Sequence, residues 1–344
     1  MLLLLCVALG QSAAGAEKVR VLDGATFADV RFEALVDELA RRDAVFFGEE
    51  HDNAAGHAFY AKLLPALQAK RPDLVLSMEM FERDVAGVLA DYLRGRVSEE
   101  EFLKRSRPWP GYKDFYRPGV ELAKDKKLDV IAANLPRPVA RLLSQNAAPD
   151  SPHAPRRTIA DKDKYWELFL DAMKGHPDPS GKPIARVELE KMSEGMFKAQ
   201  CAKDDAMAEA MADYLAAHPH RHPLMVHRNG NFHSDYGLGT ASRFQRRAPL
   251  AQISIISMVS AADVAKPDLS KSEKKAHFLL VVPEAPKKSA PKAPVAQKAP
   301  GKEKNAAPDP AAKPAPKYAP PQQPPSTNVK RIIGSGSPLP DARP

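Results

Sequence analysis

Six short runs of large apolar residues recur along the first 284 residues of the chain. Each run has the length of a strand and is continuous rather than alternating, which is typical of strands that helices cover on both faces of a sheet. We therefore predict buried strands at residues 44–47, 74–78, 128–132, 223–226, 253–259 and 278–282.

Segments with helical spacing separate the early strands. The last of them begins at a capping box, in which Ser98 is the N-cap and Glu101 follows three residues later. Alternating strands and helices predict an α/β fold with a mostly parallel sheet and helices on both faces. The predicted helices are residues 32–42, 56–69, 85–94 and 99–106.

A long stretch from about residue 138 to 222 has no strand pattern, and we predict that it is a helical subdomain inserted into the sheet. It contains two helical patterns, at 159–173 and 185–217. The second pattern carries pairs of methionines at i,i+4 spacing, which form an apolar and deformable stripe. We expect the stripe to pack in the core, and the alternative is a wall that faces a ligand. The methionines are Met192, Met196, Met207 and Met211.

The composition changes sharply at about residue 285. Residues 285–344 hold 15 of the 33 prolines, 11 basic residues and three acidic ones, so this segment accounts for the whole net charge of +8. Its composition predicts a disordered tail with polyproline II character, which serves as a spacer or adheres to an anionic cell-surface polymer. The remaining body, residues 17–284, is electrically neutral, which argues against a nucleic-acid-binding fold.

The chain begins with a short apolar run that ends in Ala14-Gly15-Ala16. This pattern predicts a signal peptide, residues 1–16, cleaved before Glu17, and the run is too short to span a membrane. Cleavage also removes Cys6 and leaves Cys201 alone, so no intramolecular disulfide can form. We therefore expect an exported protein, periplasmic or associated with the cell envelope; lipidation at Cys6, which would make it a lipoprotein, is the alternative.

Polar residues follow four of the predicted strands. In open parallel sheets the carboxyl ends of the strands share one edge, where ligands bind, so we expect these residues to surround a common site. Glu49, Glu50 and His51 follow the first strand; Glu79 and Glu82 follow the second; Asn134 and Arg137 follow the third; and the stretch HRNGNFHSDYGLG, residues 227–239, follows the fourth.

Two of these strand ends share the pattern Gly-x-x-His, at Gly48–His51 and at Gly230–His233. A glycine at the strand exit permits a tight turn, and the histidine three residues later can point back over the edge of the sheet. Two imidazoles with Glu79 suit a divalent metal or general acid–base chemistry. One copy of the pattern is a weak signal, but two copies at matching positions indicate a site.

His227 and the end of the fourth polar stretch have two interpretations each. His227 is either a buried histidine bonded to the backbone or a residue of the pocket. Asp235 and Tyr236 either orient His233 or simply build the turn. His218, His220 and His222 lie among prolines and are interpreted as loop residues.

Several of these segments together resemble the ChaN-like haem-binding uptake family, within the wider group of Tiki metalloproteases and erythromycin-esterase-like hydrolases. The resemblance runs from about residue 44 to 249, in the order of the family, and the proline-rich tail lies outside it. The segments that carry it are GEEHDN, EMFERD, RPWPGYKDFYRP, IAANLPR, AQCAKDDAMAEAMADYL and HRNGNFHSDYGLG.

The resemblance implies an exported α/β protein with a helical insertion that binds haem and serves haem or iron uptake. Members are often lipoproteins, and some dimerise around the cofactor, so a second copy of the chain and an envelope or outer-membrane uptake protein are the expected partners. Through the Tiki-like branch the resemblance implies a second possibility, a metal-dependent hydrolytic centre that holds Mn, Zn or Co. The metal ligands would come from His51, Glu49, Glu79 and His233, with Glu50 beside them, and the catalytic residues would be His51, Glu79 and His233.

Haem requires a large apolar slot, an axial ligand and basic groups for its propionates. The chain has no CxxCH motif, so covalent attachment of the c type is excluded. Candidates for the slot are the methionine stripe, Trp109, Phe115 and Phe197; for the propionates, Arg137, Arg228 and Arg243; and for the axial bond, Tyr112, Tyr116, His51 or Tyr236. The complete set predicted to bind the cofactor is His51, Glu79, Tyr112, Tyr116, Arg137, His227, His233 and Tyr236. The favoured interpretation of WPGYKDFYRP, which contains Tyr112 and Tyr116, is nevertheless a packed aromatic loop without direct ligation.

We therefore predict an exported haem-binding protein centred on His51, Glu79 and His233. The alternative is a divalent-metal hydrolase at the same residues. A third hypothesis, without haem or catalysis, is an envelope adaptor that binds its partner through the tail.

Overall fold

The computed structural model describes residues 19–174 and 184–286. The predicted signal peptide and residues 287–344 of the predicted tail lie outside this part of the chain.

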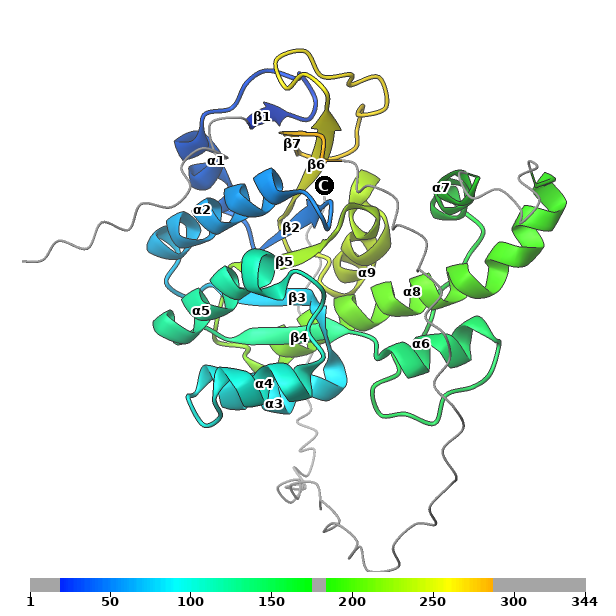
Figure 1. The fold of residues 1–344 in the computed structure, drawn as a ribbon, viewed down its shortest axis with the longest axis horizontal. Coiled ribbons are helices and arrows are strands. Elements are labelled where there is room, and N and C mark those ends of the chain that lie inside the picture. The colour runs from blue at the N-terminus through cyan, green and yellow to red at the C-terminus, as the bar shows by residue number, and fades with distance from the viewer. Residues whose placement is uncertain (1–18, 175–183, 287–344) are drawn as a thin grey trace, which may run out of the picture. The chain divides into compact units, whose positions relative to one another are not determined.

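Seven strands of the described residues form one sheet, in the order β1-β7-β6-β2-β5-β3-β4 (Figure 1). All neighbours pair in parallel except β1, which is antiparallel to β7. The six predicted strands are confirmed as β2 to β7, and β1 was not predicted because it has only four residues. The strands are β1 Arg20–Asp23, β2 Ala44–Glu49, β3 Val75–Glu82, β4 Val130–Asn134, β5 Met225–Gly230, β6 Ile253–Ala261 and β7 Phe278–Pro283.

Helices cover both faces of this sheet, which confirms the predicted α/β class. Alternate residues of β2 show the two layers: Val45 packs in a cluster with α1, α2 and α5, whereas Phe46 packs in another with α8 and α9. The helices are α1 Phe32–Leu39, α2 Ala54–Lys70, α3 Ala86–Leu93, α4 Glu99–Ser106, α5 Arg117–Lys126, α6 Arg137–Ser144, α7 Lys164–Met173, α8 Arg186–Ala217 and α9 Gly239–Arg247.

Three helices, α5, α6 and α9, were not predicted. They are eight to ten residues long, and α9 carries a buried arginine, Arg243, where an apolar residue is expected. By contrast, α4 has the predicted bounds, and the hydroxyl of Ser98 accepts the backbone N–H of Glu101 at its start.

The methionine stripe of α8 divides into two halves. Met207 and Met211 are fully buried, as expected of core residues, whereas 55% of Met192 and 40% of Met196 is exposed. The reason is visible in Figure 1: the second half of α8 crosses the sheet near β4, and its first half extends past the edge of the sheet beside α7.

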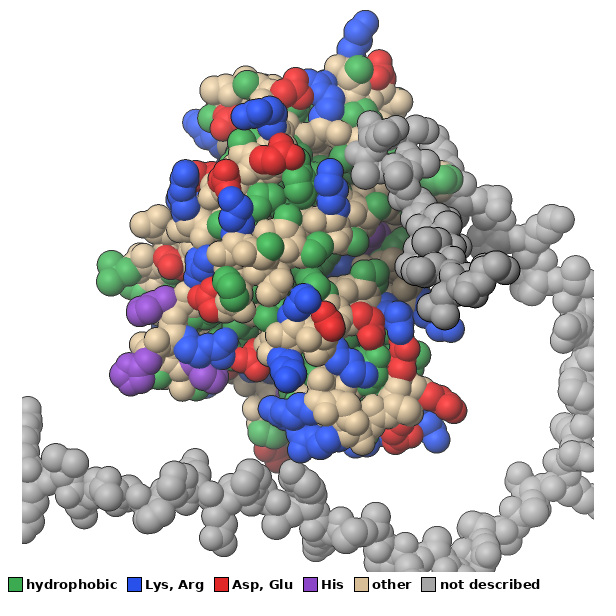
Figure 2. All heavy atoms as spheres, turned by 90° about the vertical axis from the view of Figure 1, so that its left-hand side faces the viewer, with side chains coloured by type: hydrophobic (Ala, Val, Ile, Leu, Met, Phe, Trp, Pro, Cys, Tyr) green, Lys and Arg blue, Asp and Glu red, His purple; other side chains and the backbone are tan. Residues whose placement is uncertain are grey.

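The surface of the folded body carries charges of both signs. In Figure 2 basic and acidic side chains alternate over the face shown, with no large area of either sign. This distribution agrees with the neutral body expected from the sequence. Within the described residues, no helix has the length and apolar character needed to span a bilayer.

Candidate functional site

A cavity of about 690 Å³ opens at the carboxyl ends of β2, β3 and β5. The strands supply its floor, and residues of α7 and α8, the first residue of α6 and the loop before residue 112 supply its walls. The lining consists of Glu49, Glu50, His51, Glu79, Trp109, Pro110, Arg137, Phe169, Ala172, Gln200, Lys203, Gly230, Asn231, Phe232 and His233.

His51 faces this cavity with one ring nitrogen free. Its Nδ1 lies 3.0 Å from Oε1 of Glu49, and because a carboxylate only accepts, Nδ1–H is the donor. The Nε2 atom lies over Gly230, where a Cβ would come within 2.8 Å of it. Burial lowers the pKa of His51, but the hydrogen bond to Glu49 and the charge of Glu79 outweigh it and raise the pKa overall.

Two buried side chains that do not line the cavity bind the carboxylate of Glu49. Its Oε2 accepts Nε–H of Arg228 at 2.5 Å, and its Oε1 accepts the hydroxyl of Tyr116 at 2.9 Å. Burial alone would raise the pKa of Glu49, but the charge of Arg228 and the bond from His51 lower it, so the carboxylate stays ionised. The guanidinium lies against the rings of Tyr60 and Tyr116, at 4.3 and 4.6 Å from their centroids.

His233, in contrast, has both ring nitrogens engaged. Its Nδ1 lies 2.7 Å from Oδ1 of Asp204, and its Nε2 lies 3.3 Å from Oε1 of Glu79. Burial lowers the pKa of His233, but the charges of Glu79 and Asp204 raise it to about 10, so the ring is an imidazolium at neutral pH. Glu79 is fixed in turn, because its Oε2 accepts the backbone N–H of Gly230 at 2.7 Å.

Asp204 is a residue of the site that the sequence did not single out. It is fully buried on α8, and it also accepts the hydroxyls of Tyr165 and Thr240, each at 2.9 Å. The available signal was Asp204, which lies three residues before Met207 and seven before Met211 and therefore on the same face of the helix as these apolar residues, where unpaired carboxylates are rarely buried.

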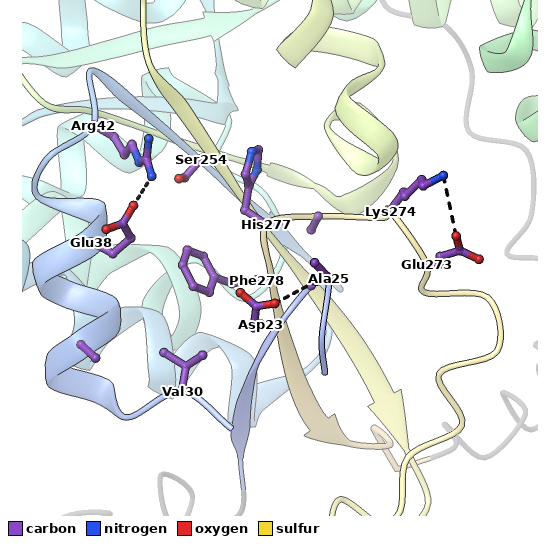
Figure 3. A pocket seen from close by; sticks show the side chains of 13 residues that line it. Asp23, Ala25, Val30, Glu38, Arg42, Ser254, Glu273, Lys274, His277 and Phe278 are labelled. Atoms are coloured by element: carbon purple, nitrogen blue, oxygen red, sulfur yellow. Dashed lines mark hydrogen bonds and ion pairs between the residues drawn. The ribbon is translucent and has the colours of Figure 1, made fainter. Parts of the chain in front are cut away.

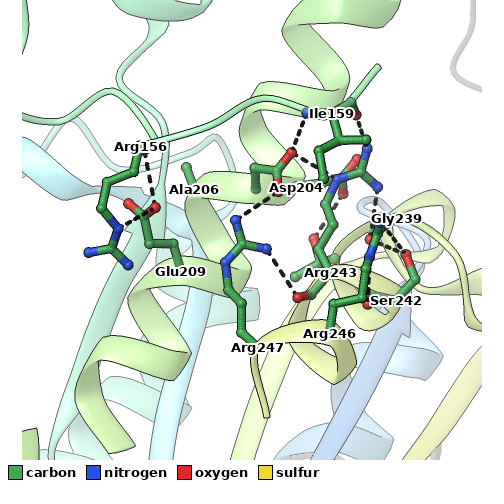
Figure 4. Close-up of polar contacts among 12 residues, drawn as sticks. Arg156, Ile159, Asp204, Ala206, Glu209, Gly239, Ser242, Arg243, Arg246 and Arg247 are labelled. Carbon is green, nitrogen blue, oxygen red and sulfur yellow. Dashed lines mark hydrogen bonds and ion pairs between the residues drawn. The ribbon is translucent and has the colours of Figure 1, made fainter. Parts of the chain in front are cut away.

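The neighbouring acids on α8 anchor the helix that carries Asp204 (Figure 4). Asp205 accepts Nε–H of Arg243 at 3.2 Å and an N–H of Arg247 at 2.9 Å, which ties α8 to α9. One turn later, Glu209 pairs with Arg156 at 3.1 Å. These pairs fix the position of α8, and therefore of the carboxylate that holds His233.

Four of the residues predicted to bind the cofactor do not line the cavity. His227 is fully buried, lies 2.8 Å from the hydroxyl of Ser77 through Nδ1, and packs edge-on against Phe46. The backbone alternation of β5 turns it toward the α8–α9 face, and burial lowers its pKa to about 3. Its interpretation as a pocket residue is therefore wrong.

The three tyrosines predicted to bind the cofactor do not line the cavity either. Tyr112 is buried in an apolar cluster with Phe81 and Phe102. Tyr116 reaches Glu49 from behind the site, as described above. The hydroxyl of Tyr236 donates to the backbone carbonyl of Lys271, so the residue builds a turn. The prediction of a tyrosine axial ligand is therefore not supported at any of these positions.

Of the three arginines predicted to bind the propionates, one lines the cavity and two do not. Arg137 lines the cavity, and 70% of its side chain is exposed. Arg228 and Arg243 are buried in ion pairs, so their predicted role as propionate partners is wrong. Lys203, which the sequence did not single out, is a second cation of the lining.

Of the three aromatic residues predicted to form the haem slot, only Trp109 lines the cavity. Trp109 lines the cavity and contacts His51 edge-on, with 5.0 Å between ring centroids. Phe115 instead stacks on His57, and Phe197 packs against Tyr165. The cavity takes its other aromatic surface from Phe169 and Phe232.

Asp235 does not orient His233. Its carboxylate accepts the hydroxyl of Ser257 at 2.6 Å and pairs with Lys275 at 3.3 Å. Asp235 therefore builds the turn, which was the other interpretation of this residue.

Within the described residues, no three His, Cys, Asp or Glu side chains are arranged to bind one metal ion. Asp204 lies at Nδ1 of His233, and Glu79 lies 3.3 Å from its Nε2. The metal centre predicted at His51, Glu49, Glu79 and His233 stays a prediction.

Comparison with known proteins identifies the family of the chain and solved structures with a similar fold. The family model described as haem-binding uptake, Tiki superfamily, ChaN matches residues 35–244. No curated protein matches the chain. Among solved structures, a structure of cofacial heme binding to ChaN of Campylobacter jejuni has a TM-score of 0.60 at 17% identity, covering 77% of this chain and 97% of that one. An erythromycin esterase EreC mutant in its open conformation has a TM-score of 0.41 at 14% identity, covering 70% and 77% of the two chains.

Proposed function

The chain belongs to the ChaN family of haem-binding uptake proteins in the Tiki superfamily, and on this premise we propose that it is an exported protein that binds haem in the cavity beyond β2, β3 and β5. The observation that carries the proposal is His51, which lines a cavity with aromatic walls and whose Nε2, above Gly230, has no hydrogen-bond partner among the described residues.

His51 is the proposed axial ligand. Of the four candidates for the axial bond, it is the one that lines the cavity. When His51 is neutral, Glu49 keeps the proton on Nδ1 and leaves the lone pair on Nε2, which is how carboxylates commonly prepare a histidine for metal binding. Because the pKa of His51 is raised, haem iron competes with a proton for this nitrogen. His233 serves instead to hold Glu79 and to keep the floor of the cavity rigid.

The rest of the lining suits the remaining parts of haem. Trp109, Phe169 and Phe232 offer aromatic surface for the macrocycle, and Arg137 and Lys203 offer cations for the propionates. The volume of about 690 Å³ lies within the range usual for cofactor sites.

We also propose that two copies of the chain associate over this cavity. The structure of the Campylobacter jejuni relative describes cofacial heme binding. In this chain the exposed Met196 and Met192 lie one and two turns of α8 before Gln200 of the cavity, so apolar surface continues outward from the site.

A hemin titration of the purified full chain tests the proposal. We expect a shifted Soret band that saturates at one hemin per chain, and at least a tenfold loss of affinity in His51→Ala. His220→Ala, which removes an exposed histidine outside the cavity, is the matched control and is expected to bind as the wild type does.

Two results would contradict the proposal. One is a spectrum equal to that of free hemin, and the other is a His51→Ala variant that binds like His220→Ala. Elemental analysis separates the hydrolase alternative, because bound Mn, Zn or Co with hydrolysis that a chelator abolishes would support it. Export is tested by N-terminal sequencing of chain recovered from the envelope of an expressing bacterium, which is expected to begin at Glu17.

A further inference from the structure

A second cavity, of about 650 Å³, lies beside the amino end of β4, the strand at one edge of the sheet. Residues of α3, α5 and α8, and the residues that follow these helices, surround it. It shares no lining residue with the cavity that contains His51, which opens at the carboxyl ends of the strands. The two cavities therefore lie at opposite ends of the parallel strands.

One part of the lining of this second cavity is aliphatic. Leu93 of α3, Leu128 just before β4, and Val130 and Ile131 of β4 supply most of it. Leu128 is buried, whereas the other three side chains are partly exposed. This surface suits a hydrocarbon chain, because removing methylene groups from water is favourable.

Three basic side chains, Arg94, Lys124 and Lys127, line the same cavity. Among the described residues none of the three forms an ion pair, and Lys124 instead lies over the ring of Tyr92, 3.8 Å from its centroid. Arg94 and Lys127 are exposed, so both can reach a bound molecule. The cavity therefore offers positive charges that no neighbouring carboxylate neutralises.

Asp129 is the one acidic residue of this lining. Its carboxylate accepts an N–H of Arg221 at 2.8 Å and the hydroxyl of Tyr214 at 2.6 Å. Arg221, which is not part of the lining, already offsets this negative charge. Even without Arg221, three cations against one carboxylate leave a surplus of two positive charges, which favours an anionic ligand.

Such a surplus is not a general feature of the cavities of this protein. Another cavity, of about 580 Å³, lies beside β1, β6 and β7 (Figure 3). Its lining has three carboxylates, those of Asp23, Glu38 and Glu273, and only two cations. Both cations are paired with these acids, Arg42 with Glu38 and Lys274 with Glu273. No anion is expected in that cavity.

We propose that the cavity beside β4 binds an amphipathic anion, that is, an aliphatic chain with an anionic head group, of which a fatty acid is the simplest. The head group lies near Arg94, Lys124 and Lys127, and the chain packs against Leu93 and Leu128. The tail of the protein itself does not fit, because residues 285–344 carry 11 basic and three acidic residues and would be repelled.

Lys127 permits a substitution that removes one charge without straining the fold. It follows the last residue of α5 and has φ 56°, a conformation that glycine adopts most readily. Lys127→Gly therefore suits the backbone and should unfold at no lower temperature than the wild type. Lys274, labelled in Figure 3, has the same φ of 56° and lies in the lining of the other cavity, so Lys274→Gly is the matched control.

Calorimetric titration of the full chain with octanoate tests this inference, and the protein is first saturated with hemin so that the haem site does not take up the probe. We expect saturable binding at one octanoate per chain, weakened by added salt because salt screens exposed charges. Lys127→Gly and Arg94→Gln should each weaken binding about threefold, and together about tenfold, since each removes one exposed ion pair with the ligand. Lys274→Gly should bind octanoate as the wild type does.

Three outcomes would overturn the proposal. Absence of saturable binding at millimolar octanoate removes the site. Wild-type affinity in the combined Lys127→Gly and Arg94→Gln variant removes the assigned cations. Equal affinity for octan-1-ol, the neutral alcohol of the same chain length, would show that the cavity takes apolar molecules without regard to charge. The hemin titration of His51→Ala is independent of all three results, because a protein that binds no hemin can be titrated with octanoate directly, and the same variants identify the cavity.

Discussion

At the level of single residues, Glu49 connects the buried core to the cavity. Its carboxylate neutralises Arg228, a fully buried arginine, and at the same time fixes the imidazole of His51. One substitution of this side chain would therefore affect both the ion pair of the core and the proposed haem site.

Glu49→Gln leaves the charge of Arg228 buried without a counter-charge. We expect the free energy of unfolding to fall by about 3–5 kcal/mol, the usual cost of breaking a buried ion pair, as measured by urea denaturation. Hemin affinity should fall as well, because the amide does not hold Nδ1–H of His51 as a carboxylate does. Glu50→Gln, next in the chain and paired with no arginine among the described residues, should lose less than about 1 kcal/mol, and an equal loss in both variants would contradict this account.

His233 makes stability depend on pH. Its folded pKa of about 10 lies above the ordinary value of 6.5, so the stability it contributes is complete below pH 6.5 and is lost as the pH rises through 10. Between pH 7 and 9 the free energy of unfolding of the wild type should fall with a slope of up to about 1.4 kcal/mol per pH unit. His233→Gln should lack this component of the slope; equal slopes in urea titrations of the two proteins would argue against a charged His233.

At the level of elements, the end of β5 lies directly beneath the ring of His51. Gly230 has φ −62° and ψ 142°, which any residue can adopt, so the backbone conformation does not require a glycine. A glycine is needed here because a side chain would enter the space that the His51 ring occupies. A Cβ there would lie 2.8 Å from Nε2 and 2.9 Å from Cε1 of His51. The ring would have to move away from the strand.

Gly230→Ala is therefore expected to lower hemin affinity about tenfold, a cost of about 1.4 kcal/mol, while the protein remains folded. The matched control is Gly87→Ala on α3, where a Cβ meets nothing within 4 Å and helix propensity predicts a gain of about 0.5–1 kcal/mol in stability. Hemin titration and thermal unfolding of both variants check this. Unchanged hemin affinity in Gly230→Ala would contradict the requirement for the His51 ring to lie directly above Gly230.

At the level of the whole molecule, the charge and the proposed chemistry belong to different parts of the chain. Residues 285–344 carry the net charge, whereas the cavities of both proposed sites lie in the neutral body. The tail and the body should therefore be separable in function.

Deletion of residues 288–344 should leave the hemin titration and the melting temperature unchanged. Retention of the protein on anionic vesicles or cell-wall polymer at low salt should decrease, because this segment supplies the basic excess. The full chain at high salt is the control for a purely electrostatic effect. Loss of hemin binding on deletion would place part of the haem site in the tail.

The sequence by itself determined the α/β class, the positions of six strands and the two strand ends that carry His51 and His233. These follow from local patterns: an apolar run of strand length specifies a buried strand, and the glycine before each histidine marks a strand exit. The segments GEEHDN and HRNGNFHSDYGLG, with the others, also sufficed to recognise the family, and the match over residues 35–244 confirms it.

Only the tertiary structure decided which side chains reach the cavity. His227 and Arg228 are adjacent in the chain but point to opposite faces of β5, and nothing local tells which face a site will use. Asp204, 29 residues before His233, arrives from another element, and whether an imidazole has a free nitrogen depends on such distant partners. For this physical reason the sequence located the strand ends that carry His51 and His233, while the fold determined which of their ring nitrogens have partners among the described residues.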